Sequence, residues 1–344
     1  MEEKIILEIM DLKKFFPVFK KGMVRSIHVG DVKALAGVKL RIRRNEVLGV
    51  VGESGSGKTT LGRVMLNLIN PTDGQAILYS SKFTAGEEIE ANNIYNLVGQ
   101  AENLIFRKSV QIVFQDPYGS LNPRMTVLDI ISEPLIIHFP NMSKKQREER
   151  VLELLKLVGL EPYHASRFPH EFSGGQRQRI GIARALAVEP EVIILDEPVS
   201  ALDVAVQAQI INLLIDLKEE LNLTYIFIAH DLSVVRHISD RICVMYLGKV
   251  MELAPADLFF TEAAHPYTEA LISAVPIPNP LLVRKRIILE GDPPNPINPP
   301  SGCVFRTRCR YAEALCAEEE PELREIADNH IVACHFPLKK KSMI

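Results

Sequence analysis

The stretch Gly52-Glu53-Ser54-Gly55-Ser56-Gly57-Lys58-Thr59 matches the pattern G-x-x-x-x-G-K-[ST] at every fixed position. It follows the apolar run Val47–Val51, which is typical of a strand buried on both faces of a sheet, and we expect a helix after it. Glycines allow a tight turn in which successive N–H groups and the start of the helix point at phosphate. An ordinary glycine-rich turn would not need Lys58 and Thr59 at these positions.

The stretch therefore predicts a P-loop that binds ATP. Lys58 is expected to neutralise the β- and γ-phosphates, and the Thr59 hydroxyl is expected to ligate Mg²⁺. The residues that we expect at the nucleotide are Gly52, Ser54, Gly55, Gly57, Lys58, Thr59 and Thr60.

A second motif supports this interpretation. The apolar run Val192–Leu195 predicts a buried strand that ends at Asp196 and Glu197. Asp196 is expected to reach the metal through water, and Glu197 to polarise the attacking water as a general base. Acidic residues are common at strand ends, so the motif gains its meaning from its pairing with the P-loop.

The order of the predicted elements indicates an α/β fold. Apolar runs at Val192–Leu195 and Tyr225–Ala229 read as buried strands, and Val204–Leu221 between them has helical spacing. Strands that alternate with helices imply a largely parallel sheet with right-handed crossovers. We expect a helical subdomain at about 116–175, and an exposed, weakly periodic insertion at 82–104.

Composition limits the partners. The net charge of −3 gives no bulk attraction to nucleic acid or to an anionic membrane. The chain opens with acidic residues and nowhere contains 18 consecutive apolar residues, so we expect neither a signal peptide nor a membrane span. A peripheral position at the cytoplasmic face of a membrane would therefore require another subunit.

Further motifs flank the acidic pair in a recognisable order. Ser173-Gly174-Gly175-Gln176 lies upstream, and His230 ends the strand downstream. With these motifs the chain resembles the ABC-transporter ATPases, in which the Ser-Gly-Gly-Gln signature faces the ATP of the opposite subunit. A helix N-terminus with glycine N–H groups and a hydroxyl suits an anion. The structural alternative is that Ser173 only caps a helix.

The resemblance implies roles for several other residues. Gln115 matches the Q-loop, which contacts Mg²⁺ and the water; Asp203 matches the D-loop at the dimer interface; His230 matches the switch histidine at the γ-phosphate. Glu197, His230 and Gln115 are thus the expected catalytic set. Phe16, with Phe15 as the alternative, is expected to stack on adenine. One P-loop and one signature imply that a second ATPase subunit completes each site.

The resemblance extends to one importer family. Four stretches are similar to the oligopeptide/dipeptide importer ATPases, at 115–125, 197–204, 265–271 and 291–303. Residues 12–17 and 58–63 are similar to the second of the two ATPase types usually paired in these importers. The similarity implies a heterodimer, two permeases and an external solute-binding protein. Peptide, nickel and oligosaccharide remain open as cargo. A soluble ABC ATPase of translation or DNA repair is the alternative class.

Cysteines gather near the C-terminus. Prolines crowd residues 276–300 and predict a linker or wrapped arm, after which Cys303, Cys309, Cys316 and Cys334 follow. Their spacing is longer than in usual zinc sites. Four thiolates suit a [4Fe–4S] cluster, which the resemblance also implies, with Zn²⁺ as the alternative. Unligated core cysteines, a redox sensor that gates the ATPase, and lastly disulfides also stay open.

These features predict two domains. Residues 1–260 are expected to form the ABC ATPase domain, and residues 261–344 a small C-terminal regulatory domain that is rich in cysteine and holds the metal cluster. Cys243 lies in an apolar strand and is expected to be plain core.

Overall fold

The computed structural model describes residues 4–21, 26–83, 89–97, 99–275 and 286–338. The chain packs as two compact units. Unit 1 contains residues 1–6, 43–47 and 77–228, and unit 2 contains residues 7–42, 48–76 and 229–344.

Unit 1 contains a parallel arrangement of three short strands. Strand β7 (Val192–Asp196) pairs with β6 (Val110–Val113) on one side and with β8 (Thr224–Ile228) on the other. Every residue of β7 and β8 is buried, which explains why their stretches 192–195 and 225–228 are continuously apolar. Helix α6 (Val204–Leu221) connects β7 to β8, as predicted.

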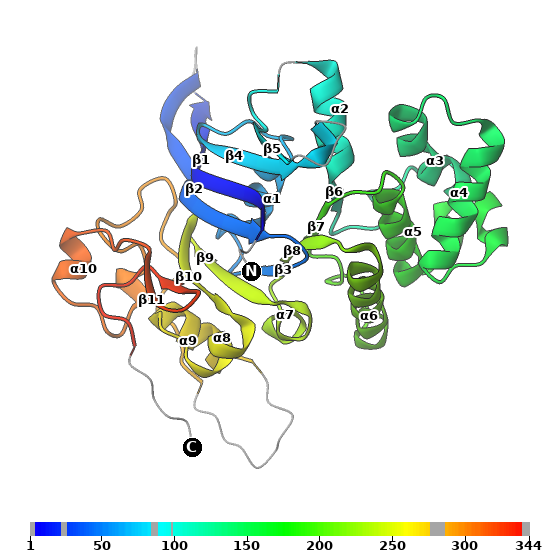
Figure 1. Ribbon diagram of the computed structural model, residues 1–344. Helices are drawn as coiled ribbons and strands as arrows, with labels where there is room; N and C mark the ends of the chain where they lie inside the picture. The colour runs from blue at the N-terminus through cyan, green and yellow to red at the C-terminus, as the bar shows by residue number, and fades with distance from the viewer. Residues whose placement is uncertain (1–3, 22–25, 84–88, 98, 276–285, 339–344) are drawn as a thin grey trace. The chain divides into compact units, whose positions relative to one another are not determined.

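A helical group follows β6 in the same unit (Figure 1). It contains α3 (Val127–His138), α4 (Lys144–Leu157) and α5 (Gly174–Leu186), with two short 3₁₀ turns, η2 (Pro162–Ser166) and η3 (Pro169–Glu171), before α5. The Ser143 hydroxyl accepts from the Gln146 N–H, which starts α4 with a capping box. Buried residues of α4 lie on one face, as its periodicity indicates. Helices α3 and α4 lie within residues 116–175, whereas α5 ends at Leu186, so the helical subdomain and its bounds stay a prediction.

The predicted insertion at 82–104 is more ordered than its polarity indicates. Strand β4 (Asp73–Ser80), whose residues from Ile77 onward belong to unit 1, is followed by a 3₁₀ turn, η1 (Ser81–Phe83), and pairs antiparallel with β5 (Glu90–Asn93). Helix α2 begins at Gln100 and ends at Ser109. The prediction of a loop is therefore wrong for β5 and α2, because strand pairing and the buried Phe106 outweigh weak local periodicity. Residues 84–88 and 98 lie outside the described residues.

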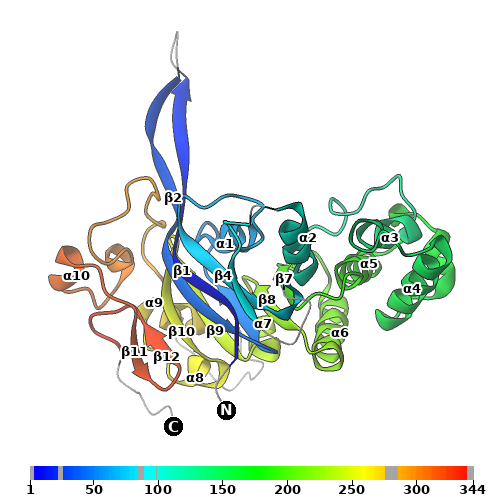
Figure 2. The same ribbon diagram turned by 45° about the horizontal axis from the view of Figure 1, so that its top comes forward.

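Unit 2 contains the P-loop and its strand. Strand β3 (Val47–Val51) pairs in parallel with β9 (Arg241–Tyr246), which pairs antiparallel with β10 (Lys249–Pro255). Helix α1 (Lys58–Met65) follows the loop, and α7 (Leu232–Ile238) precedes β9. Strands β1 (Ile5–Lys21) and β2 (Ser26–Arg43) run side by side, and β1 also neighbours β4 (Figure 2).

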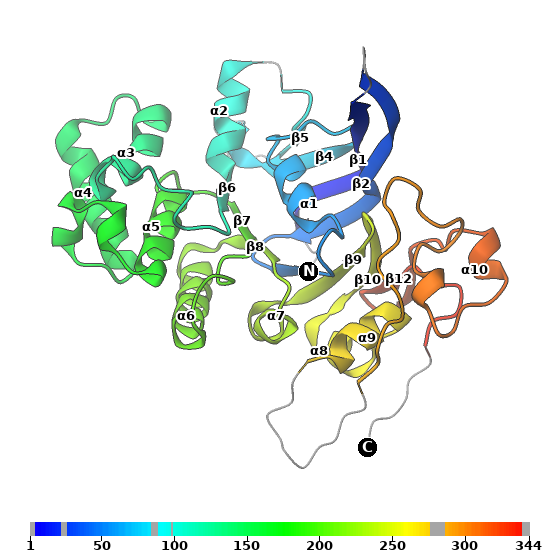
Figure 3. The same ribbon diagram turned by 180° about the vertical axis from the view of Figure 1, so that it is seen from behind.

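The C-terminal part of unit 2 is attached to β10. Strand β12 (His330–Val332) pairs antiparallel with β10, and β11 (Arg324–Ala327) pairs with β12. Helices α8 (Ala256–Thr261) and α9 (Pro266–Ser273) pack on β10 (Figure 3). The cysteine segment, Cys303–Cys334, also contains a 3₁₀ turn, η4 (Arg306–Arg308), and the short α10 (Leu315–Glu318) ahead of β11 and β12.

These contacts do not support a separate cysteine-rich domain. The described residues from 286 onward pack in the same compact unit as the P-loop. One cause is buried in β10: Glu252 accepts hydrogen bonds from the N–H groups of Ala264 and His265, and from the His330 ring. Pro276, Pro278 and Pro280 of the predicted linker lie outside the described residues, whereas the Pro296 carbonyl accepts from the Lys33 N–H.

No helix in the described ranges is both long and apolar enough to cross a bilayer.

Candidate nucleotide-binding site

The P-loop adopts a backbone that requires glycine at two positions. Gly52 has φ of 150°, and a Cβ there would lie 2.2 Å from the Met245 carbonyl oxygen. Gly57 has φ of 103°, and its Cβ would lie 2.4 Å from the Ala34 oxygen. No side chain caps the N-terminus of α1, so its first N–H groups suit an anion. The loop therefore has the geometry that phosphate binding needs.

Lys58 lies across this loop. Its side chain is buried, and Nζ donates to the carbonyl oxygens of Gly52, at 2.7 Å, and Glu53, at 3.0 Å. Ser54 and Gly55 are exposed at the turn, and Thr59 and Thr60 lie in the first turn of α1. The ammonium group is thus held at the centre of the loop, where it can neutralise bound phosphates.

Unit 1 brings the acidic pair and the predicted Q-loop residue together. Asp196 ends β7 and is buried, and Glu197 follows it in the left-handed region, with φ of 48°. The Glu197 N–H donates to the Ile228 carbonyl, and the Gln115 amide donates to the Glu197 carboxylate at 2.7 Å. A non-glycine residue in this conformation is strained, which is common where a side chain must be aimed for function. The contact orients Glu197 as a general base would need.

His230 lies in unit 2. It is exposed two residues after the end of β8, and the N–H of the intervening Ala229 donates to the Val50 carbonyl of β3. Asp231 caps α7 by accepting from the Ser233 N–H. The predicted switch histidine is therefore held between a strand end and a helix cap.

The signature begins a helix. Ser173 is the N-cap of α5: its hydroxyl accepts from the Gln176 N–H, and the Gln176 side chain accepts from the Ser173 N–H. A Cβ on Gly175 would lie 2.4 Å from Val206 of α6. Ser173 therefore caps α5 and Gly175 packs against α6, and the binding role of the signature stays a prediction. Asp203 similarly caps α6, since its carboxylate accepts from the Val206 N–H.

The two candidate adenine residues differ in surroundings. The Lys14 ammonium lies 5.0 Å from the centre of the Phe16 ring. Phe15 lines a cavity of about 400 Å³ together with Lys33, Leu247 and Pro299. Neither ring is fully buried. Stacking of adenine on Phe16, or on Phe15, stays a prediction.

The four C-terminal cysteines face one small cavity in unit 2. Cys303, Cys309, Cys316 and Cys334 line it together with the rings of His265 and Phe305. Its volume is about 10 Å³, room for about one water. Burial raises the pKa of the Cys303, Cys309 and Cys334 thiols, that of Cys334 to about 12. Among the described residues, no group of three or more histidine, cysteine or acidic side chains is arranged to hold a metal ion.

All five cysteines are free thiols. Cys243 is fully buried in β9, which confirms the prediction that it is plain core. Burial raises its pKa to about 12.

Comparison with known proteins identifies the family. The family model "ABC transporter" matches residues 35–200, and the model "Oligopeptide/dipeptide transporter, C-terminal region" matches residues 251–316. The oligopeptide transport ATP-binding protein AppF of Bacillus subtilis is 53% identical over 97% of this chain and 98% of its own length. The OppF protein of Escherichia coli is 49% identical over 96% of both chains. The chain belongs to the oligopeptide/dipeptide ABC transporter ATP-binding proteins.

A solved structure supports the fold of this ABC ATPase. The ATP-binding cassette MJ0796, in a dimeric post-hydrolysis state bound to ADP and Pi, is 32% identical with a TM-score of 0.59. The match covers 73% of this chain and 99% of that one. The chain thus has the P-loop α/β fold of ABC ATPases, and its reaction is ATP hydrolysis coupled to transport.

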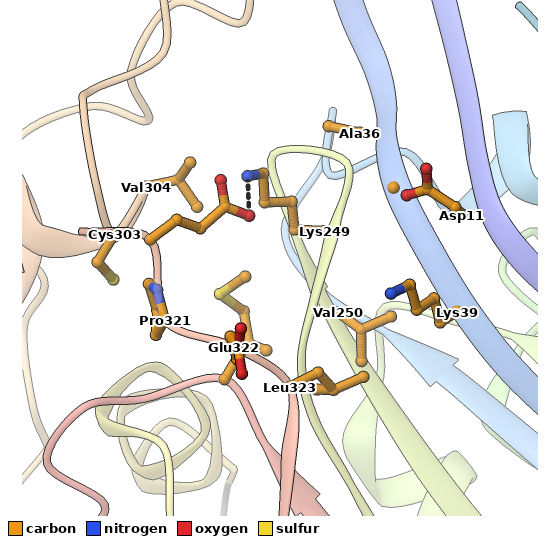
Figure 4. Close-up of a pocket in the computed structure, with 14 residues that line it drawn as sticks. Asp11, Ala36, Lys39, Lys249, Val250, Cys303, Val304, Pro321, Glu322 and Leu323 are labelled. Carbon is orange, nitrogen blue, oxygen red and sulfur yellow. Dashed lines mark ion pairs between the residues drawn. The ribbon is translucent and has the colours of Figure 1, made fainter. Parts of the chain in front are cut away.

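A larger cavity in unit 2 contains no residue of the P-loop in its described lining (Figure 4). It has a volume of about 460 Å³, and β10 and residues 320–323 contribute to its walls. Lys249 forms an ion pair with Glu320 at its edge. This ion pair links the residues between Cys316 and Cys334 to strand β10.

The P-loop motif gives no indication of the contacts that Glu53 makes. The P-loop pattern leaves position 53 variable, yet Glu53 contacts Tyr267 and Arg308, which follow it by more than 200 residues. Tyr267 lies in the family-like stretch 265–271, which is the only hint that the sequence offers. Arg308 lies outside every nucleotide motif.

Proposed function

We propose that this ABC ATPase powers the import of di- or oligopeptides across the cytoplasmic membrane. The observation that carries the proposal is similarity at about 50% identity, over nearly the whole chain, to proteins named for oligopeptide and dipeptide transport. The C-terminal match at residues 251–316 supports the same cargo class. Nickel or oligosaccharide uptake by the same ATPase is the second candidate.

The residues of the site fit hydrolysis of ATP with Mg²⁺. The Thr59 hydroxyl and the Asp196 carboxylate are hard oxygen donors of the kind that Mg²⁺ prefers, and they would hold the ion. Bound Mg²⁺ would neutralise charge on the phosphates. The loop N–H groups and Lys58 orient the phosphates. Glu197, aimed by Gln115, accepts a proton from the attacking water, and His230 hydrogen-bonds the γ-phosphate.

A second ATPase subunit completes each site in this proposal. The chain has one P-loop and one signature. The signature and the D-loop residue would therefore face the ATP bound by a partner; they comprise Ser173, Gly174, Gly175, Gln176 and Asp203. Closure of the two subunits would drive transport. The partner is a different ATPase of the same family, so the pair is a heterodimer.

The proposed assembly contains three further components. Two transmembrane permeases hold the ATPases at the cytoplasmic face of the membrane, and an external solute-binding protein delivers the cargo. Nucleic acid has no part in it, which agrees with the net charge of −3.

We further propose that the four cysteines hold a [4Fe–4S] cluster, with Zn²⁺ as the alternative. The support is the donor set: four thiols line one cavity, and thiolates are the ligands of such clusters. Because that cavity is only about 10 Å³, the side chains must rotate outward to admit any cluster. The bound group would stabilise the residues between Cys303 and Cys334, and no step of ATP hydrolysis passes through it.

Isolation of the native complex tests the assembly and its cargo. We expect two ATPases, two permeases and a binding protein that retains peptide, and peptide should stimulate ATP turnover in proteoliposomes. A binding protein that retains nickel or oligosaccharide would replace the proposed cargo. Co-isolation with a ribosome or a DNA-repair complex, without permeases, would reject the transport role.

Elemental analysis of the anaerobically purified chain tests the metal proposal. About four irons and four sulfides per chain are expected. One zinc per chain would favour the alternative. Unchanged metal content and unchanged stability in Cys309→Ser would reject both the iron–sulfur cluster and the zinc site.

A further inference from the structure

Three groups hold Glu53, the second residue of the P-loop. Its N–H donates to the Tyr267 hydroxyl oxygen at 2.9 Å, and its carbonyl accepts from Lys58 Nζ at 3.0 Å. Its carboxylate accepts from Arg308 Nη1 at 2.7 Å. The same residue therefore joins Lys58, α9 and the cysteine segment within unit 2.

The contact with Arg308 is sheltered from solvent. The Arg308 side chain is 8% exposed and that of Glu53 is 27% exposed. The Arg308 guanidinium also donates to the Tyr246 hydroxyl at 3.4 Å. Shielding from water makes such a charge-assisted pair stronger than one on the surface.

The position of Arg308 depends on the cysteine segment. Arg308 ends the η4 turn, which begins three residues after Cys303, and Cys309 follows it. The Cys303 N–H donates to the Cys316 carbonyl, and the Cys303 carbonyl accepts from Arg306. Phe305 packs edge-on against Tyr246, with ring centres 5.3 Å apart. A rearrangement of the cysteines would therefore move the guanidinium.

Charge explains why this matters for the nucleotide. Glu53 places a carboxylate on a loop whose other groups attract a polyanion. Without a cation beside it, that carboxylate would repel the phosphates and would pull at Lys58. Arg308 neutralises the charge of the Glu53 carboxylate and restricts the rotation of its side chain.

We propose that Arg308 is a positioning residue that couples the cysteine site to the P-loop by neutralising and orienting Glu53. The proposal rests on the ATP site of the family and needs no particular group at the cysteines. By linkage, ATP and a ligand bound at the cysteines change each other's binding free energy by the same amount.

The first test measures ATP affinity of the full chain with a fluorescent ATP analogue. Arg308→Met should raise the Kd about tenfold, since a hydrogen-bonded charged group loses its partner. Arg310→Met is the matched control, because it removes a more exposed ion pair with Glu269 that does not touch the loop. The control should change the Kd by less than about twofold.

Rescue separates positioning from a general loss of structure. Arg308→Met combined with Glu53→Gln removes the unpaired charge and should restore most of the affinity, although it restores no packing. Arg308→Lys keeps the charge and should fold even if the methionine variant does not. Equal affinity in the Arg308 and Arg310 variants would overturn the proposal, as would failure of Glu53→Gln to rescue in a folded protein.

The second test measures the reverse direction. The rate at which the cysteines react with an alkylating reagent, or release metal to a chelator, is compared with and without the non-hydrolysed analogue. Nucleotide should change the rate in the wild type and lose this effect in Arg308→Met. An effect of equal size in both proteins would contradict coupling through Arg308, whether or not the cysteines hold a cluster.

Discussion

Gly57→Ala is expected to damage the P-loop far more than Gly55→Ala, although both positions have positive φ. Gly57 has φ of 103° and Gly55 has φ of 78°, so either alanine carries backbone strain of about 1–2 kcal/mol. The surroundings separate them. A Cβ on Gly57 would lie 2.4 Å from the Ala34 carbonyl oxygen, whereas a Cβ on Gly55 would meet no atom within 4 Å.

The neighbour of Gly57 has little room to yield. The Ala36 N–H donates to the Gly248 carbonyl at 2.9 Å, and the Gly248 N–H donates to the Ser56 carbonyl at 2.9 Å. These bonds tie the backbone around Ala34 to the loop itself. The loop must therefore shift, and we expect a total cost of about 2–4 kcal/mol for Gly57→Ala against about 1–2 kcal/mol for Gly55→Ala.

Urea unfolding and ATP binding together check this expectation. Gly57→Ala should lower the midpoint of unfolding more than the control and raise the Kd for ATP at least about tenfold, because the first N–H groups of α1 turn away from the phosphates. Gly55→Ala should lower the midpoint less, because a Cβ at that position meets no atom within 4 Å. Equal midpoints in the two variants would contradict the expected clash at Gly57.

The remaining predictions concern the chemistry and the partner. Glu197→Gln should keep ATP binding but lose most turnover in the assembled complex, because the water loses its base while the loop is intact; near-normal turnover would exclude Glu197 as that base. Lys58→Ala should weaken nucleotide binding itself, and an unchanged Kd would contradict its contact with phosphate. Ser173→Ala should cost about 1 kcal/mol of stability through the lost cap of α5. Its effect on turnover should appear only in the assembled dimer, so an equal loss of nucleotide affinity in the monomer would argue against a role in trans.

Patterns that depend on near neighbours were readable in the sequence. The capping box of Ser143 and Gln146, the buried strands before Asp196 and His230, and the loop before Lys58 all have the predicted local structure. Each is encoded by residues a few positions apart, where backbone geometry and burial limit the possible side chains.

Weak periodicity misled in the same chain. Residues 90–93 look like exposed polar loop but form β5, because their backbone pairs antiparallel with β4. The cysteines also look like a separate module, whereas the residues around them pack in the unit of the P-loop through β10 and Glu252. In both cases the deciding contact is with another segment of the chain, so the local pattern does not show it.

The sequence alone determined the chemistry of the loop, since Gly57, Lys58 and Thr59 at that spacing have few purposes other than holding phosphate. The side-chain contacts of the site residues, by contrast, depend on the tertiary structure. Gln115 reaches Glu197 across 82 positions, and Arg308 reaches Glu53 across 255. The physical reason is that a turn is specified by the torsion angles of adjacent residues, whereas an ion pair depends on how whole strands and helices pack, which no short stretch contains.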